Sequence, residues 1–261
     1  MFYDNLWHLD DRLLECRGTV VDEDWNVIVL PFKKVFNYGE NGTTVDPDRE
    51  VIAVEKINGF MAAVTMTQKY GLIISTTGSL DSSYAKLARK WIEQLEYSDC
   101  FLEGETYLFE ICDKSDPHIV EEDEGAYLIG IRDHETGRLY SELSLYHIAT
   151  SQSCKRPKTT RLKFKDIPQT EREGFMIRDA ITEEVLCKLK SNYYLSKKAI
   201  MRLGRAKVDI LFDNPELFKR RVDEEFYQLV DFLSENIDKE VFRNYTDQQR
   251  RDLIERYFYG C

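Results

Sequence analysis

Proline and glycine are scarce in this chain, which has 6 Pro and 13 Gly among 261 residues. With 32% charged and 43% hydrophobic residues, this scarcity excludes a collagenous, low-complexity or disordered protein. No apolar run approaches the roughly 18–20 residues that a membrane-spanning helix needs. The length is enough for one substantial core, or for a core with a small satellite.

Paired cysteine spacings are also missing. The six cysteines are scattered, and none forms a CxxC motif. This pattern indicates reduced thiols rather than a disulfide framework or a zinc site. The first sixteen residues are acidic and lack a basic-then-apolar leader, so we expect no secretory signal and a cytoplasmic protein.

The charge is acidic overall but unevenly distributed. A formal net charge of −11 argues against wholesale binding of nucleic acid, because the long-range field would repel a polyanion. Residues 93–124 hold twelve Asp or Glu and one basic residue. By contrast, residues 155–165 hold six basic residues and no acid, and residues 188–207 hold seven more without an acid. These stretches are either solvated faces or a surface for a phosphate backbone, and charge alone does not decide between them.

Short strand-like runs dominate the first 190 residues. The pattern predicts a hairpin over 19–30 and then a meander over 51–78. Further strand-like runs lie at 106–112, 126–133, 174–179 and 185–190.

Other segments have the apolar spacing of helices. Apolar residues at four-residue spacing predict a helix over 82–97. After Tyr193 the chain is helical to its end, with Asn214-Pro215 as the cap and first position of one helix. We therefore expect an α+β fold, with a mixed or antiparallel-sheet body over residues 1–205 and a small helical domain over residues 206–261.

A lysine between an apolar run and a glycine begins the most informative pattern, at residues 55–59 (EKING). Three segments follow it: Glu110 in LFEIC, Glu173 before GFMIRD, and Lys188 and Lys190 in LCKLKS. The last two residues are two positions apart and share one face of a strand. Each residue alone is ordinarily a solvated strand residue, but the ordered set indicates one site.

These residue types suit the attack of an amine on a nucleotide α-phosphate. The amine must be deprotonated, which a neighbouring cation and partial burial promote. Cations around the triphosphate neutralise charge as pyrophosphate leaves, and carboxylates bind Mg²⁺ and ribose hydroxyls. The amine would be that of Lys56. The cations would be Lys188 and Lys190, and the carboxylates would be those of Glu110 and Glu173.

Two upstream segments, CRGT at residues 16–19 and PFKKVFNYGE at residues 31–40, extend the pattern. With them the chain resembles the covalent lysine nucleotidyltransferases, which comprise RNA ligases, DNA ligases and capping guanylyltransferases. It is most similar to the bacteriophage RNA ligase 1 type and to the adenylyltransferase domain of fungal tRNA ligases. The resemblance covers residues 14–195 in the correct order and implies a nucleotidyltransferase domain followed by the helical domain. For a chain of phage origin, the compartment would be the host cytoplasm.

The resemblance also implies a role for each matching residue. Lys56 would become adenylylated by ATP, in a loop shaped by Asn58 and Gly59, with Glu55 beside the base. Cations would hold the phosphates: Arg17, Lys34, Lys188 and Lys190.

Three further residues complete the implied site. Phe36 would help to build the pocket, Glu110 would bind the ribose or the Lys56 loop, and Glu173 would engage Mg²⁺ or Mn²⁺ directly or through water. One departure concerns the common Thr-Lys-Gly-Ser pattern, which reads TTGS at residues 76–79 here. Because Thr77 cannot supply a positive charge, Arg17 and Lys34 would have to compensate.

The implied function is that of an ATP-dependent RNA ligase. It would join RNA 5′-phosphate and 3′-hydroxyl ends through lysine–AMP and RNA–adenylate intermediates, in RNA or tRNA repair. A cleaved tRNA is a candidate substrate, an end-healing kinase or phosphatase is a candidate partner, and no membrane is involved. The basic stretches 155–165 and 188–207 are candidates for the RNA-facing surface, and the helical domain is a candidate RNA-specificity element.

Three alternatives remain open at this point. Capping enzymes and DNA ligases normally add a β-barrel after the Lys-x-Lys strand, whereas about 70 mostly helical residues follow Lys190 here. A catalytically idle nucleotide- or RNA-binding module would keep the fold without Lys56 chemistry. An acidic interaction protein would have no nucleotide site at all.

Overall fold

The structure, a computed structural model, describes residues 9–95, 101–222 and 226–259. The chain divides into two compact units. The first comprises Met1–Pro168 and Gly174–Leu189, and the second comprises Gln169–Glu173 and Lys190–Cys261. The boundary expected after residue 205 lies within the second unit.

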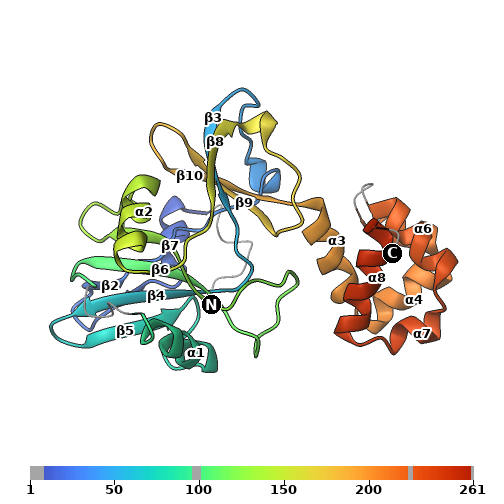
Figure 1. The fold of residues 1–261 in the computed structure, drawn as a ribbon, viewed down its shortest axis with the longest axis horizontal. Coiled ribbons are helices and arrows are strands. Elements are labelled where there is room, and N and C mark those ends of the chain that lie inside the picture. The colour runs from blue at the N-terminus through green and yellow to red at the C-terminus, as the bar shows by residue number, and fades with distance from the viewer. Residues whose placement is uncertain (1–8, 96–100, 223–225, 260–261) are drawn as a thin grey trace. The chain divides into compact units, whose positions relative to one another are not determined.

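Two four-stranded sheets and a small hairpin form the first unit (Figure 1). The hairpin consists of β1 (Val20–Val21) and β2 (Val27–Val29). The sheet that we call the β3 sheet has the order β10 (Val185–Lys190), β9 (Gly174–Asp179), β3 (Glu50–Glu55) and β8 (Thr159–Lys163). The β6 sheet has the order β5 (Gly71–Thr76), β4 (Phe60–Thr67), β6 (Glu105–Cys112) and β7 (Gly125–Asp133). Short 3₁₀ helices lie at Asp11–Cys16, Glu40–Gly42 and Phe164–Asp166.

The expected strands are confirmed, but the expected meander is wrong at its first step. β4 and β5 pair as a hairpin, whereas β3 leaves them and pairs with β8 and β9 in the other sheet. Val54 of β3 lies opposite Met176 of β9 and Thr159 of β8, and the sequence pattern does not predict β8 as a strand. The chain thus changes sheets between β3 and β4, where residues 56–59 lie.

Two helices cover one face of the β6 sheet, α1 (Ser83–Ile92) and α2 (Glu142–Ser151). Their buried residues pack with Phe109 and Leu128 in the largest core of this unit. The Ser82 side chain caps α1 by accepting a hydrogen bond from the Ala85 N–H. α1 ends five residues before the expected end at 97, which itself lies outside the described residues. The pattern gives no signal for α2.

A β-bulge lies in β7. Phe109 of β6 pairs with Leu128, and the preceding Leu108 pairs with Gly130, so that Ile129 has no partner opposite it. A bulge inserts one residue and changes which face the following residues point to. Ile129 alternates with Leu128 and lies, like Tyr127, on the face of the β6 sheet that is opposite to the α1 and α2 side, where it packs with Ile57 and Tyr127. The bulge returns Ile131 to the side of Leu128.

The second unit is helical. Its helices are α3 (Asn192–Met201), α4 (Arg205–Asp213), α5 (Pro215–Lys219), α6 (Tyr227–Asn236), α7 (Lys239–Arg243) and α8 (Asp247–Tyr259) (Figure 1). They bury their own core, which includes Phe242 and Ile254. The expected Asn214 cap is confirmed, because its side chain accepts a hydrogen bond from the Leu217 N–H with Pro215 at the first helical position. No helix among the described residues is long and apolar enough to cross a membrane.

Candidate nucleotide site

The end of β3 positions Lys56. Its backbone N–H donates a hydrogen bond of 2.9 Å to the carbonyl oxygen of Gly174, at the start of β9. Its side-chain Nζ lies 3.5 Å from the carbonyl oxygen of Ile57 in its own loop. The backbone of the expected nucleophile is thus fixed to the β3 sheet just before the chain crosses to the β6 sheet.

Glycine is sterically required at position 59 of this loop. A Cβ atom there would lie 2.2 Å from the carbonyl oxygen of Ile111 in β6, far inside any normal contact. The Gly59 N–H donates to Glu110 Oε1 at 3.1 Å, and Asn58 Oδ1 accepts from the Val120 N–H at 2.9 Å. Asn58, Gly59 and Glu110 therefore hold the loop after Lys56 in place.

A cavity of about 380 Å³ opens between the two sheets of the first unit. Its volume lies within the range of small-molecule sites, about 300–1,000 Å³. The structure brings six of the expected site residues together in its lining: Arg17, Glu55, Lys56, Gly59, Glu110 and Lys188. Thr77, which stands where the family often has Lys, lines it as well. The Lys56 loop, cations and a carboxylate thus share one cavity.

Other expected residues of the first unit lie outside this lining. Lys33 lines the cavity, whereas its neighbour Lys34 lies with Nζ 5.5 Å from the centroid of the Phe36 ring. The Phe36 carbonyl accepts a hydrogen bond from the Lys188 N–H at 2.9 Å, so this segment runs beside β10. Asn58 is buried and acts through its loop contact.

Glu173 and Lys190 belong to the second unit, at the two places where the chain passes between the units. Lys190 Nζ lies 3.6 Å from Glu173 Oε1 and 5.1 Å from the centroid of the Tyr194 ring. Glu173 is 3% exposed, and its carbonyl oxygen accepts from the Ser191 N–H. The two expected site residues therefore form an ion pair with each other.

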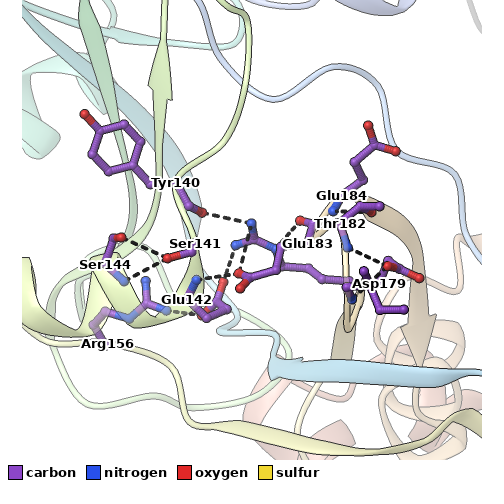
Figure 2. A network of polar contacts seen from close by, with 11 residues as sticks. Tyr140, Ser141, Glu142, Ser144, Arg156, Asp179, Thr182, Glu183 and Glu184 are labelled. Carbon is purple, nitrogen blue, oxygen red and sulfur yellow. Dashed lines mark hydrogen bonds and ion pairs between the residues drawn. The ribbon is translucent and has the colours of Figure 1, made fainter.

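Sequence reasoning missed a buried polar network that reaches the cavity (Figure 2). The two oxygens of Glu142 accept hydrogen bonds from Arg178 Nη1 and Arg156 Nη2. Arg178 also donates to the carbonyl oxygens of Tyr140, at 2.9 Å, and Glu183, at 2.7 Å. Glu142 and Arg178 both line the cavity. Arg178 lies in the predicted strand GFMIRD but is not one of the motif residues, and Glu142 at the start of α2 lies outside every motif.

The thiol of Cys112 is buried against the Lys56 loop. Its Sγ would lie 3.0 Å from a Cβ at position 59. Burial raises the pKa of Cys112 to about 12, and the carboxylates of Glu110 and Glu122 act in the same direction. Because the thiolate is the nucleophilic form, the raised pKa disfavours attack by this thiol near neutral pH, and Lys56 stays the expected nucleophile of this loop.

Comparison with known proteins identifies the family of the chain. Residues 15–198 match the family model described as RNA ligase, and the chain therefore belongs to the RNA ligase family. No curated protein matches the chain.

Two solved structures share the fold. An archaeal ATP-dependent RNA ligase, described as form 1, has a TM-score of 0.60 and 17% identity, covering 92% of this chain and 67% of that chain. Its second form gives a TM-score of 0.56 and 16% identity over the same shares. An RNA ligase of Naegleria gruberi with pyrophosphate gives 0.45 and 17%, covering 58% of this chain and 52% of that one. The α+β fold expected from the sequence is confirmed.

Proposed function

We propose that the chain is an ATP-dependent RNA ligase that joins a 5′-phosphate to a 3′-hydroxyl through lysine–AMP and RNA–adenylate intermediates. The observation that carries this proposal is the position of Lys56 in a cavity that it shares with cations and a carboxylate. Arg17, Lys33 and Lys188 supply the positive charge, and Glu110 supplies the carboxylate. Membership of the RNA ligase family supports the same class of reaction.

In the first step, the neutral amine of Lys56 attacks the α-phosphorus of ATP. A nitrogen–phosphorus bond forms, the bond from the α-phosphorus to the bridging oxygen breaks, and pyrophosphate leaves. The amine gives up its proton to solvent. Arg17 and Lys188 lie where they can stabilise the charge that develops on the phosphates, which is usually the largest contribution to such a reaction.

The next two steps transfer the nucleotide and seal the RNA. An oxygen of the RNA 5′-phosphate attacks the lysine-bound phosphorus, which breaks the nitrogen–phosphorus bond and frees Lys56. The 3′-hydroxyl then attacks the RNA 5′-phosphorus, and AMP leaves. One ATP is thereby converted to AMP and pyrophosphate for each phosphodiester formed.

The carboxylates present fit a divalent cation that is bound jointly by the protein and by the substrate phosphates. Among the described residues, no group of three or more His, Cys, Asp or Glu could hold a metal ion. Mg²⁺ commonly keeps several waters and binds through one or two carboxylates plus substrate phosphates, so a single carboxylate is enough. Following the family pattern, we assign Glu173 to Mg²⁺ or Mn²⁺ and Lys190 to the phosphates. The bound ion would neutralise phosphate charge.

The basic stretches offer different surfaces for RNA. In residues 155–165, Arg156 is buried in the Glu142 network and Lys155 donates to the Glu124 carbonyl oxygen. Lys163 and Lys165 are half exposed and pair with Asp48 on the surface, and such pairs are weak enough to yield to a phosphate. We assign the RNA-facing role to these exposed lysines and to the second unit.

Reversing the charge of Arg202, Arg205 and Lys207 to Glu is expected to weaken RNA binding without changing lysine adenylylation. The three side chains are exposed in the second unit. If each contacts a phosphate, the slope of log K against log salt falls by about 0.7 per residue on single-stranded RNA. Binding to 5′-phosphorylated RNA at several salt concentrations measures this slope.

A matched control reverses Lys86 and Arg89 on the exposed side of α1. An equal loss per charge in the control would show a general field effect and would count against the second unit as the RNA-selecting element.

Replacing Glu110 with Ala is expected to slow lysine adenylylation by about 100-fold. A displacement of the Lys56 amine by about 1 Å lowers the reaction rate by roughly this factor. The reason is that the Gly59 N–H loses the acceptor that fixes the Lys56 loop. Single-turnover adenylylation measures the rate. Glu103→Ala is the control, since Glu103 also accepts a backbone N–H, from Gln68, but is exposed and outside the cavity lining. Equal rates for the two variants would contradict the role of Glu110.

The experiment that tests the proposal is a joining assay with ATP, Mg²⁺ and RNA that carries 5′-phosphate and 3′-hydroxyl ends. We expect joined RNA and a transient RNA–adenylate. A capping enzyme would instead form a GMP adduct, a DNA ligase would prefer nicked duplex DNA, and an idle module would bind nucleotide without an adduct. Broken tRNA anticodon loops are the first natural substrates to compare, and a kinase or phosphatase would be needed where cleavage leaves the opposite end chemistry.

A further inference from the structure

Two buried charged side chains lie at the end of the cavity that is remote from Lys56. In the β3 sheet, Arg178 of β9 pairs with Ile52, four residues along β3 from Lys56. At about 3.3 Å per residue, this places the backbone of Arg178 about 13 Å from that of Lys56. A nucleoside monophosphate bonded to Lys56 spans a similar length. Its base, rather than its phosphate, would therefore reach Arg178.

The walls between these two ends are apolar. Val54 and Met176 face the cavity from the β3 sheet, and the bulged Ile129 faces it from the β6 sheet. Pro157 closes the lining near Arg156. Flat apolar walls with a few polar groups at one end are typical of sites that bind a ring system in one orientation.

The polar end presents an acceptor and a donor side by side. Glu142 is buried, and its Oε1 accepts from Arg178 Nη1. A carboxylate oxygen can accept a second hydrogen bond, and Nη1 carries a second N–H. Arg156, the Tyr140 carbonyl and the Glu183 carbonyl hold the two side chains in place (Figure 2). The pair is thus fixed before a ligand arrives, as specific recognition requires.

We infer that Glu142 and Arg178 read the edge of the purine base and select adenine. The 6-amino group of adenine would donate to the Glu142 carboxylate, and N1 would accept from Arg178. Hypoxanthine and guanine reverse both groups, because O6 would face the carboxylate and the N1–H would face the guanidinium. The inference rests on the proposed function only in taking a purine nucleotide as the occupant of the cavity.

The selection can be measured without any catalytic step. Calorimetry with AMP and IMP, on protein first treated with pyrophosphate to remove bound AMP, compares two nucleotides that differ only at this edge. We expect the wild-type protein to bind AMP about 10- to 100-fold more tightly, the range for a hydrogen bond to a charged group. In Glu142→Gln the amide can rotate to donate to O6, so the ratio of the two dissociation constants should fall at least about tenfold.

A purely structural network would give a different result. Glu142→Gln would then weaken AMP and IMP equally, and an unchanged ratio would overturn the inference. The ratio does not depend on the folded fraction, so destabilisation of the variant cannot imitate a change in selectivity. Glu105→Gln is the matched control: Glu105 is buried and bonds the Tyr140 hydroxyl, but it is outside the cavity lining, and its ratio should stay at the wild-type value.

Three outcomes separate this inference from the proposed function. Selective AMP binding without a lysine adduct would refute the ligase and leave base selection standing. A lysine adduct, together with an unchanged ratio of the AMP and IMP dissociation constants in Glu142→Gln, would support the ligase and refute base selection by Glu142. Binding of neither nucleotide by the wild-type protein would overturn both.

Discussion

Replacing Lys56 with Ala should abolish joining of 5′-phosphorylated RNA, by more than about 10⁴-fold, while leaving the sealing of pre-adenylated RNA largely intact. The reason is that, in the proposed mechanism, Lys56 makes and breaks bonds in the first two steps only. In the third step of that mechanism the RNA itself carries the AMP, and we expect the remaining residues of the cavity lining to bind it. Gel assays with the two RNA substrates, run in parallel, measure the contrast.

The contrast between substrates also controls for folding. A variant that failed to fold would lose both activities, whereas the nucleophile variant should lose one. Lys86→Ala, at an exposed position of α1, should retain both. Joining of 5′-phosphorylated RNA by Lys56→Ala would show that another residue accepts the nucleotide.

Replacing Gly59 with Ala should be the most damaging change of a residue that carries no functional group. Its Cβ would lie 2.2 Å from the Ile111 carbonyl oxygen, which belongs to the β4–β6 ladder and cannot rotate away. Either the Lys56 loop or β6 must move. We expect a loss of about 1–3 kcal/mol in the free energy of unfolding. Displacement of Lys56 by about 1 Å should slow adenylylation by about 100-fold.

Gly78→Ala provides the matched control for this change. Gly78 follows Thr77 of the cavity lining, yet a Cβ there meets nothing within 4 Å. Thermal unfolding and the adenylylation rate of this variant should stay near the wild-type values. If Gly59→Ala were equally mild, the loop would be looser than its contacts with Ile111 and Glu110 indicate.

Local patterns predicted the strands well but not how they assemble. Alternation and apolar runs located β4, β5, β6, β7, β9 and β10, because each buries at least one face. They did not show that β3 pairs with β8 and β9, since that partnership joins segments more than 100 residues apart. The edge strand β8 is mostly exposed and therefore has no apolar strand pattern. In the sequence it appears only as part of a basic stretch.

The site residues that belong to the ordered motifs could be predicted from the sequence. Residues that tertiary packing alone brings to the cavity could not. Lys56, Gly59, Glu110 and Lys188 follow from the motif, and the structure gathers them in one cavity. The motif could not show that Lys33 rather than Lys34 lines it, because that depends on how an irregular segment is held. Nor could local patterns show Glu142, which lies at the start of α2 and belongs to no motif.

The central claim is that Lys56 carries AMP as a covalent intermediate. The most direct test is the intact mass of pyrophosphate-treated protein after incubation with ATP and Mg²⁺, followed by peptide mapping of the product and run beside GTP. We expect the gain of one AMP with ATP only, located on the peptide that contains Lys56 and absent from Lys56→Ala. No adduct with either nucleotide, or an adduct on another residue, would contradict it.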